Sequence, residues 1–367
     1  MTRKKIYVIT GEASGDLHGA NLVAQLIRKA DVELMGMGGE LLQKAGVKIL
    51  HDYREVNYMG FVDVFKHLRT ILRKINQVKK EIEAEKPDAV LLIDYPGFNM
   101  RIAKHCKKIG IKVIYYISPQ IWAWKQSRVY KIKATVDEMI TILPFEKDFY
   151  KKFGVDVHYV GHPLLDAIQQ FDYNEDFIHE LQEKAGGKKI VALLPGSRRA
   201  EIISKLPVML YLADKYKNEY YFVVAGAPGA HKDLYAQAGI DVYFGQTYNI
   251  LKEAYAALVT SGTATLETAL HQVPQVVCYK TSEFNYQAGK RLVKVKYISL
   301  VNLILDKPSV TELIQRDLND TRLEKEFLLI TGEKREEILS DYRNLINLLA
   351  DSGASERAAD IVKKSIL

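Results

Sequence analysis

Residues 89–99 read AVLLIDYPGFN, a short apolar run that ends in a carboxylate and a Pro-Gly turn. An uninterrupted aliphatic run of this length, bounded by turn residues, is typical of a strand that is buried on both faces of a sheet. A stretch with helical spacing follows it, and the same alternation recurs along the chain. Such alternation predicts βαβ units and parallel sheets.

The predicted strands form two series, one in each half of the chain. The first series comprises residues 5–10, 89–94, 112–117, 138–143 and 157–161, and the second comprises residues 190–194, 220–225, 241–244, 257–260 and 275–279. We therefore expect an α/β protein with two Rossmann-like, doubly wound parallel-sheet domains and C-terminal helices.

The polar, acid-rich segment 166–188 separates the two series and contains the predicted domain boundary. The N-terminal domain is expected to span residues 1–165, the second domain residues 166–345, and a C-terminal helix residues 346–367. From residue 309 onward the pattern is helical throughout. These last helices either cover the second sheet or pack back on the first.

The composition is that of a folded protein with an anionic partner. Of the 367 residues, 48% are hydrophobic, and 52 Lys and Arg against 45 Asp and Glu give a net charge of +7. This excess favours nucleic acid, a phospholipid surface or a phosphorylated substrate, but no nucleic-acid-binding module is recognisable. The two cysteines form no CxxC pair and favour a reducing compartment. We expect neither a signal peptide nor a membrane span.

In open parallel sheets, ligands bind at the carboxyl ends of the strands, so the loops that follow the strands are candidate sites. Asp94 ends a buried strand, where desolvation would raise its pKa and make it a general base. The alternative is that it caps the next helix or begins the turn. Glu12 and Ser14 follow the first strand, either at the mouth of a cleft or in a plain turn whose Asp16 caps the helix. We assign Glu12, Ser14 and Asn99 to the acceptor side.

The segment LPGSRRAE at 194–201 ends a strand and begins a helix with two arginines in its first turn. Cations oppose the helix dipole at that end, so a bound anion would explain their placement. Backbone N–H groups, Ser197 and the guanidinium of Arg198 would form a diphosphate site without a metal. Because no D-x-D triplet and no H-E-x-x-H occur, we predict no metal and no other cofactor.

The segment VTSGTATLE at 259–267 ends another strand. Its small residues would let phosphates approach the backbone, and Glu267 would bind two ribose hydroxyls. The alternative is that Thr263 caps the helix and that Glu267 only lies favourably near its positive end. The small residues assigned to the nucleotide are Ser261, Gly262, Thr263 and Ala264.

Apolar residues between 61 and 82 repeat with a helical period, and lysines and arginines fill the other faces. Such a helix either packs on its own sheet or lies on an anionic membrane. Both interpretations fit the spacing.

A series of short motifs, in order between residues 11 and 303, resembles the lipid-A-disaccharide synthase family. The motifs are GEASGD (11–16), MG (59–60), DYPGFN (94–99), SPQIWAW (118–124), LPFE (143–146), VGHP (160–163), LPGSR (194–198), SGTATLE (261–267) and SLVNL (299–303). The resemblance implies a metal-free GT-B glycosyltransferase that moves a sugar from UDP-2,3-diacylglucosamine to the 6-hydroxyl of 2,3-diacylglucosamine 1-phosphate. Asp94 would then be the base, Arg198 would hold the diphosphate and Glu267 the ribose.

The resemblance also implies partners for the protein. It implies a homodimer that exchanges C-terminal segments, in which Asn302 completes the UDP site. It further implies reversible attachment to anionic phospholipid at the cytoplasmic face of the inner membrane. The implied membrane patch consists of Val62, Val64, Phe65, Leu68, Ile71 and Leu72.

Two other functions are alternatives on the sequence alone. One is a different GT-B activity on UDP-N-acetylglucosamine, either transfer to a lipid-linked precursor or 2-epimerisation. The other is a non-catalytic module that binds UDP-sugar or phospholipid. The joint presence of Asp94, Arg198 and Glu267 argues against the module.

Overall fold

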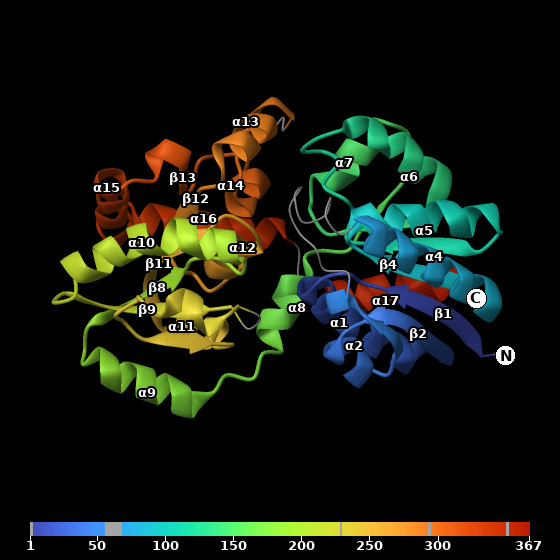
Figure 1. Cartoon of the computed structure of the whole chain (residues 1–367), viewed down its shortest axis with the longest axis horizontal. Coiled ribbons are helices and arrows are strands. Elements are labelled where there is room, and N and C mark those ends of the chain that lie inside the picture. The colour runs from blue at the N-terminus through green and yellow to red at the C-terminus, as the bar shows by residue number, and fades with distance from the viewer. Residues whose placement is uncertain (1–2, 56–67, 228–229, 293–294, 350–351) are drawn as a thin grey trace. The chain divides into compact units, whose positions relative to one another are not determined.

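The computed structural model describes residues 3–55, 68–227, 230–292, 295–349 and 352–367. The chain divides into two compact units, each of which is described by itself (Figure 1). The first unit comprises Met1–Gln169 and Leu349–Leu367, and the second comprises Gln170–Leu348.

The first unit is built on a parallel sheet of seven strands in the order β3-β2-β1-β4-β5-β6-β7. The strands are β1 (Lys4–Ile9), β2 (Val32–Gly38), β3 (Lys48–Asp52), β4 (Ala89–Ile93), β5 (Lys112–Tyr116), β6 (Glu138–Thr141) and β7 (His158–Tyr159). All five residues of β4 are buried, as expected for a strand with helices on both of its faces. Its neighbours are β1 and β5, so Asp94 follows a central strand.

Strands β2 and β3 are absent from our sequence prediction. Glycines interrupt the apolar pattern of β2, and at Gly36 a Cβ atom would stand 2.0 Å from the carbonyl oxygen of Val8. Strand β3 lies at the sheet edge and has a single buried residue, His51. Neither segment carries the apolar run that identified the central strands.

Helices cover both faces of this sheet (Figure 1). They are α1 (Ala13–Lys29), α2 (Glu40–Lys44), α4 (Leu68–Glu85), α5 (Pro96–Lys108), α6 (Val129–Thr135), α7 (Glu146–Lys151), α8 (Pro163–Gln169) and α17 (Ala354–Ile366). The last helix, α17, belongs to the first unit and packs against α1. Lys29 of α1 forms ion pairs with Glu356 at 3.0 Å and with Asp360 at 2.6 Å. Of the two sequence alternatives, packing back on the first unit therefore holds for α17.

Helix α4 presents its apolar stripe to the core of the first unit. Its buried residues are Ile71, Ile75, Val78 and Ile82. Ile71 is therefore a core residue, and its assignment to an exposed membrane patch is corrected: the helical period that places it beside Ile75 also turns it inward. Leu72 is 41% exposed, and Leu68 is partly buried. The other predicted patch residues, Val62, Val64 and Phe65, lie outside the described residues.

The second unit contains a parallel sheet of six strands in the order β10-β9-β8-β11-β12-β13. The strands are β8 (Lys189–Leu194), β9 (Tyr220–Gly226), β10 (Val242–Phe244), β11 (Ala254–Thr260), β12 (Gln275–Tyr279) and β13 (Thr311–Ile314). Its helices are α9 (Glu175–Ala185), α10 (Arg199–Lys215), α11 (Thr247–Glu253), α12 (Thr263–Leu270), α13 (Glu283–Leu292), α14 (Leu300–Leu305), α15 (Asp320–Thr331) and α16 (Arg335–Leu348). Phe177 of α9 and Ile250 of α11 pack in one core with Ala192 of β8.

The expectation of an all-helical segment after residue 309 is wrong for β13. The sequence Thr-Glu-Leu-Ile pairs with β12, so that Val276 lies opposite Thr311. Four residues with one buried side chain, Leu313, carry too little apolar signal to identify an edge strand. Within the described part of the chain, none of the helices combines the length and the apolar character needed to cross a bilayer.

Candidate active site

Asp94 stands at the carboxyl end of β4 in a constrained loop. Asp94 and Tyr95 both have left-handed backbone conformations, with φ of 46° and 47°. Such conformations cost energy in non-glycine residues and persist where surrounding contacts enforce them. The N–H of Asp94 donates to the carbonyl of Tyr116 at 2.9 Å, and its own carbonyl accepts from the hydroxyl of Tyr115 at 2.6 Å. These bonds to β5 hold the backbone that carries the carboxyl group.

The carboxyl group of Asp94 has the proton affinity of a general base. Burial raises its pKa to about 6, although a hydrogen bond from the backbone of Tyr95 acts in the opposite direction. A carboxylate with a pKa of about 6 is ionised at neutral pH and binds a proton more tightly than an exposed aspartate does. This group can therefore take a proton from a hydroxyl group in a reaction near pH 7.

Asn99 acts on the backbone of the same loop. It is fully buried, and its side-chain amide donates to the carbonyl oxygens of Asp94 at 2.8 Å and Ile93 at 3.2 Å. Its side-chain oxygen has no hydrogen-bond partner among the described residues. Asn99 thus holds the backbone of Asp94 through its carbonyl oxygen.

The loop after β1 lies against the loop of Asp94. A Cβ atom on Gly11 would stand 2.2 Å from the ring of Tyr95, so only glycine admits this close approach. Burial, and to a smaller degree the charge of Glu12, raise the pKa of Tyr95 to about 12. Glu12 is the N-cap residue of α1, and Ser14 in the first turn is exposed.

Asp16 caps a helix, but not the one suggested by the sequence. Its buried carboxylate accepts from the backbone N–H groups of Gly39 at 2.7 Å, Leu41 at 3.0 Å and Leu42 at 3.3 Å. These groups begin α2, whereas Asp16 belongs to α1. The correction follows from the pairing of β1 with β2, which brings the loops after both strands to the same edge.

In the second unit, the backbone N–H groups of the loop after β8 donate to a carboxylate of the helix that follows it. Arg198 is the N-cap of α10. Glu201 accepts from the backbone N–H groups of Ser197 at 3.2 Å and Arg198 at 3.3 Å, and from the Arg198 guanidinium at 3.4 Å. An incoming diphosphate would compete with this carboxylate for the same donors. Glu201 was not among the predicted site residues, although its spacing from Arg198 is that of a capping box.

The loop after β11 is open to solvent. At Gly262, with φ of 150°, a Cβ atom would meet nothing within 4 Å. Gly262 and Thr263 are exposed, and Ala264 is partly buried. The hydroxyl of Ser261 donates to the carbonyl of Ile298 at 2.9 Å. Gly262, rather than Thr263, occupies the N-cap position of α12, and no side chain caps this helix.

Glu267 is held by a tyrosine that the sequence analysis did not identify. The hydroxyl of Tyr248, in α11, donates to Oε1 of Glu267 at 2.9 Å. Burial raises the pKa of Glu267, while the Tyr248 hydrogen bond opposes that shift. The contact joins residues 19 positions apart on different helices, so no local pattern could have revealed it.

Asn302 is buried, and its side chain bonds within the second unit. Its amide donates to the carbonyl of Val310 at 2.8 Å and to Glu312 at 3.0 Å, and its oxygen accepts from the N–H of Val310 at 2.9 Å. Glu312 also accepts from the N–H of Ile298 at 3.0 Å. Because the carbonyl of Ile298 holds Ser261, this network supports the loop after β11.

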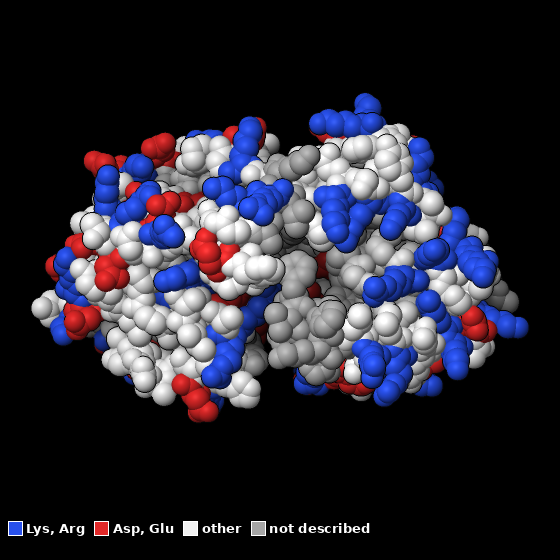
Figure 2. All heavy atoms as spheres, turned by 45° about the horizontal axis from the view of Figure 1, so that its top comes forward, with Lys and Arg blue, Asp and Glu red and all other residues white. Residues whose placement is uncertain are grey.

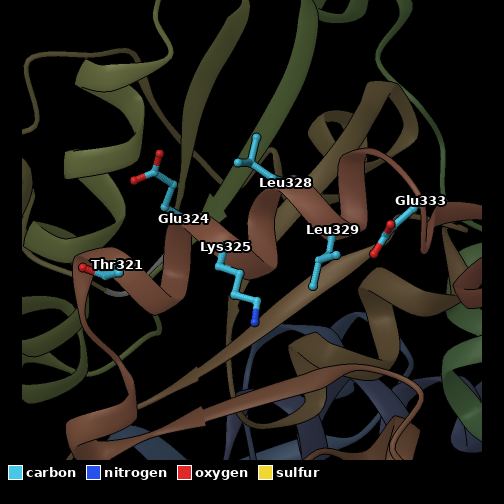
Figure 3. A pocket seen from close by; sticks show the side chains of 6 residues that line it. All are labelled: Thr321, Glu324, Lys325, Leu328, Leu329 and Glu333. Carbon is cyan, nitrogen blue, oxygen red and sulfur yellow. The ribbon is translucent and has the colours of Figure 1, made fainter.

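A shallow hollow of about 540 Å³ lies along α15, away from these loops in sequence. Figure 3 shows its lining side chains projecting from that helix and the turn after it. They are Thr321, Glu324, Lys325, Leu328, Leu329 and Glu333. None of them was a predicted site residue. Among the residues that the structure describes, no group of three or more His, Cys, Asp or Glu side chains is arranged to hold a metal ion.

The fold is shared with solved structures of low sequence identity. UDP-GlcNAc 2-epimerase from Neisseria meningitidis covers 99% of this chain and all of its own, with a TM-score of 0.68 and 13% identity. The glycosyltransferase of kitacinnamycin covers all of both chains, also with a TM-score of 0.68 and 13% identity. These likenesses concern the fold, and they confirm the expected GT-B class with parallel-sheet α/β domains.

Sequence relatives are far more similar. Lipid-A-disaccharide synthase of Syntrophus aciditrophicus is 41% identical over 384 residues, which covers 100% of both proteins. The protein of the same name from Geobacter sulfurreducens is 38% identical over 373 residues, 98% of this chain and 97% of its own. The family model described as lipid-A-disaccharide synthetase matches residues 6–365. The chain therefore belongs to the lipid-A-disaccharide synthase family, a family of glycosyltransferase enzymes.

Proposed function

We propose that this protein transfers 2,3-diacylglucosamine from UDP to the 6-hydroxyl of 2,3-diacylglucosamine 1-phosphate. The products are a β-1,6-linked disaccharide 1-phosphate and UDP, in the synthesis of lipid A. The observation that carries the proposal beyond family membership is Asp94, a largely buried carboxylate with a raised pKa at the end of a central strand.

Asp94 is the proposed general base. The acceptor oxygen attacks the anomeric carbon of the donor sugar as the bond from that carbon to the diphosphate breaks. The proton of the 6-hydroxyl passes to the carboxylate of Asp94, and the electron pair of the broken bond leaves with UDP. In-line attack opposite the leaving group inverts the anomeric centre. Glu12, Ser14 and Asn99 serve the acceptor side, with Asn99 acting through the Asp94 backbone.

The leaving diphosphate is assigned to the second unit. Ser197, Arg198 and the first N–H groups of α10 stabilise its charge, the effect that is usually largest in such reactions. Glu201 must leave these donors when the diphosphate arrives, because both are anions. Ser261, Gly262, Thr263 and Ala264 admit the nucleotide to the start of α12.

The nucleoside and the loop around it complete the donor assignment. Glu267, oriented by Tyr248, accepts from two ribose hydroxyls. Asn302 supports this site through its bonds to Val310 and Glu312. This assignment uses no metal and no other cofactor.

Substrates that carry two acyl chains reside in a lipid bilayer, so the enzyme would meet them at a membrane surface. We therefore include reversible attachment to anionic phospholipid at the cytoplasmic face of the inner membrane. Leu68 and the exposed Leu72 of α4 belong to this surface, together with Val62, Val64 and Phe65 as assigned from the sequence, but without the buried Ile71. A homodimer with exchanged C-terminal segments is also proposed; it would have to preserve contacts such as Lys29 to Asp360 between chains.

The test is to incubate the purified protein with UDP-2,3-diacylglucosamine and to follow UDP. We expect release of UDP only when 2,3-diacylglucosamine 1-phosphate is added, and no loss of rate in EDTA. Two other outcomes would instead support the alternative GT-B activity on UDP-N-acetylglucosamine. One is release of UDP without the acylated acceptor, and the other is epimerisation of UDP-N-acetylglucosamine. The variant Asp94→Asn should keep the fold and lose about 10²- to 10⁴-fold in turnover.

A further inference from the structure

Among the described residues, the large hydrophobic side chain with the highest exposed fraction belongs to α13. Phe284, in the first turn of this helix, is 81% exposed. Burial of an aromatic side chain is a large favourable contribution in water, so such exposure is costly unless the side chain has a partner. Within the described part of its own unit, this side chain is not covered.

The helix has a distinct outward face. Successive residues turn by 100°, so Phe284, Gln287 and Arg291 share one face. Tyr286 lies on the opposite side and is partly buried, whereas Phe284, Gln287 and Arg291 are all exposed. The apolar side chain and a cation thus point away from the unit together.

The charge around Phe284 is mainly positive. Lys280, Lys290 and Arg291 are exposed, and among the described residues none of them forms an ion pair. The acidic neighbour Glu283 accepts a hydrogen bond from Gln287 at 2.6 Å. Figure 2 shows that Lys and Arg side chains on the drawn face of the second unit lie interspersed with Asp and Glu side chains.

The neighbouring helix α10 adds a second exposed apolar side chain. The hydroxyl of Ser204 donates to the carbonyl of Lys280 at 3.5 Å, which places α10 beside the segment that leads into α13. Ile203, the residue before Ser204, is 55% exposed. We call Ile203, Lys280, Phe284, Lys290 and Arg291 the α13 surface.

We propose that the α13 surface binds anionic phospholipid, so that the second unit has a membrane contact of its own. The inference rests on the proposed function, because a donor with two acyl chains is drawn from a bilayer. Phe284 enters the boundary between headgroups and acyl chains, while Lys280, Lys290 and Arg291 meet lipid phosphates.

A second copy of the chain fits this surface less well. Stable protein interfaces bury on the order of 1,200 to 2,000 Å², whereas the α13 surface offers two apolar side chains among cations. In a two-fold contact the same patch faces itself, so its lysines and arginine would repel their counterparts. An anionic lipid surface complements both features.

The experiment uses the full chain and vesicles of phosphatidylcholine with or without about a third of phosphatidylglycerol. The variant Phe284→Trp places a fluorophore on the α13 surface, and its difference spectrum against the parent reports that position alone. We expect a blue shift with the anionic vesicles that salt reverses, and little shift with pure phosphatidylcholine. Phe284→Ser should bind the anionic vesicles about tenfold or more weakly, and Arg291→Gln about threefold to fivefold more weakly.

Leu328→Ser, at a 48% exposed leucine of α15, is the matched control and should bind as the parent does. An absent blue shift, or unchanged vesicle binding by Phe284→Ser, would overturn the proposal. So would a blue shift that appears without vesicles and grows with protein concentration, which would indicate a second copy. UDP release from detergent-dispersed substrates separates the two claims: Phe284→Ser should retain it, and its absence in the parent would refute the proposed function while leaving the vesicle result standing.

Discussion

The carboxylate of Asp166 accepts a hydrogen bond from the backbone N–H of Ser355 at 2.8 Å, although 189 residues separate the two. Its other oxygen accepts from the N–H of Gly353 at 2.5 Å. Asp166 lies in α8, three residues before the first unit ends at Gln169, and Gly353 and Ser355 lie where the returning chain enters α17. One buried carboxylate therefore joins the departing and returning segments within the first unit.

Asp166→Ala should lower the free energy of unfolding by about 1–3 kcal/mol per N–H group left without a partner. The exposed ion pair of Lys29 with Asp360 is the control, and Asp360→Ala should cost less than about 1 kcal/mol. Urea unfolding measures both, and hydrogen exchange in α17 should increase in the first variant. Equal stability of the two variants would contradict this function of Asp166.

The pKa of Asp94 predicts an acid limb in the pH profile of the reaction. Because burial raises this pKa to about 6, kcat/KM should rise with pH and level off above about 7. The raised pKa also means that ionisation of Asp94 destabilises the folded state, so Asp94→Asn should be the more stable protein at neutral pH. A profile without an inflection near pH 6, or an Asn variant that loses stability, would argue against this description.

Glu146 predicts a pH dependence of stability in the first unit. Burial raises its pKa to about 7, despite hydrogen bonds from the backbone N–H groups of Leu143 and Ile142. Since the folded state binds this proton more tightly, its stabilising effect is complete below pH 4.5, the ordinary pKa of the group, and is lost as the pH rises through about 7. Glu146→Gln should gain stability relative to the parent over this range. Urea unfolding at several pH values measures this difference. A difference in unfolding free energy between Glu146→Gln and the parent that does not change between pH 4.5 and about 7 would refute the assignment.

Gly11→Ala tests the contact between the loops of the first unit. The new Cβ would stand 2.2 Å from the ring of Tyr95, so the ring and the backbone of Asp94 must shift. We expect a loss of about 1–3 kcal/mol in stability together with a fall in kcat. Gly97→Ala, in the same region but with nothing within 4 Å of its Cβ position, is the matched control. Equal kcat for the two variants would show that this contact does not position Asp94.

Tyr248→Phe tests the support of Glu267. Loss of the 2.9 Å hydrogen bond leaves the partly buried carboxylate of Glu267 without this donor and raises its pKa further. UDP should then bind about threefold to tenfold more weakly, which corresponds to the net free energy of about one hydrogen bond. Isothermal titration calorimetry with UDP measures the change. Inorganic pyrophosphate, which has no ribose, is the control ligand, and its affinity should be the same for the variant and the parent. Unchanged UDP affinity would remove Tyr248 from the site.

The apolar strands were predictable because their signal is local. Residues 89–93 form an unbroken aliphatic run, which is how a strand buried on both faces appears in a sequence. Strands β2, β3 and β13 were missed because glycine, edge position or a length of four residues removes that run. Ile71 shows the opposite error: its helical period was correctly recognised, but a period does not say which partner the apolar face meets.

The sequence alone determined which residues end the strands and which chemical groups they offer: a carboxylate after β4, an arginine at the start of α10, and glycine and small residues before α12. These depend on neighbours along the chain. Only the tertiary structure decided that Tyr115 holds the backbone of Asp94, that Tyr248 holds Glu267, and that Asp166 joins α8 to the segment before α17. Such contacts depend on parallel strand pairing and burial, which bring together groups that no sequence spacing relates.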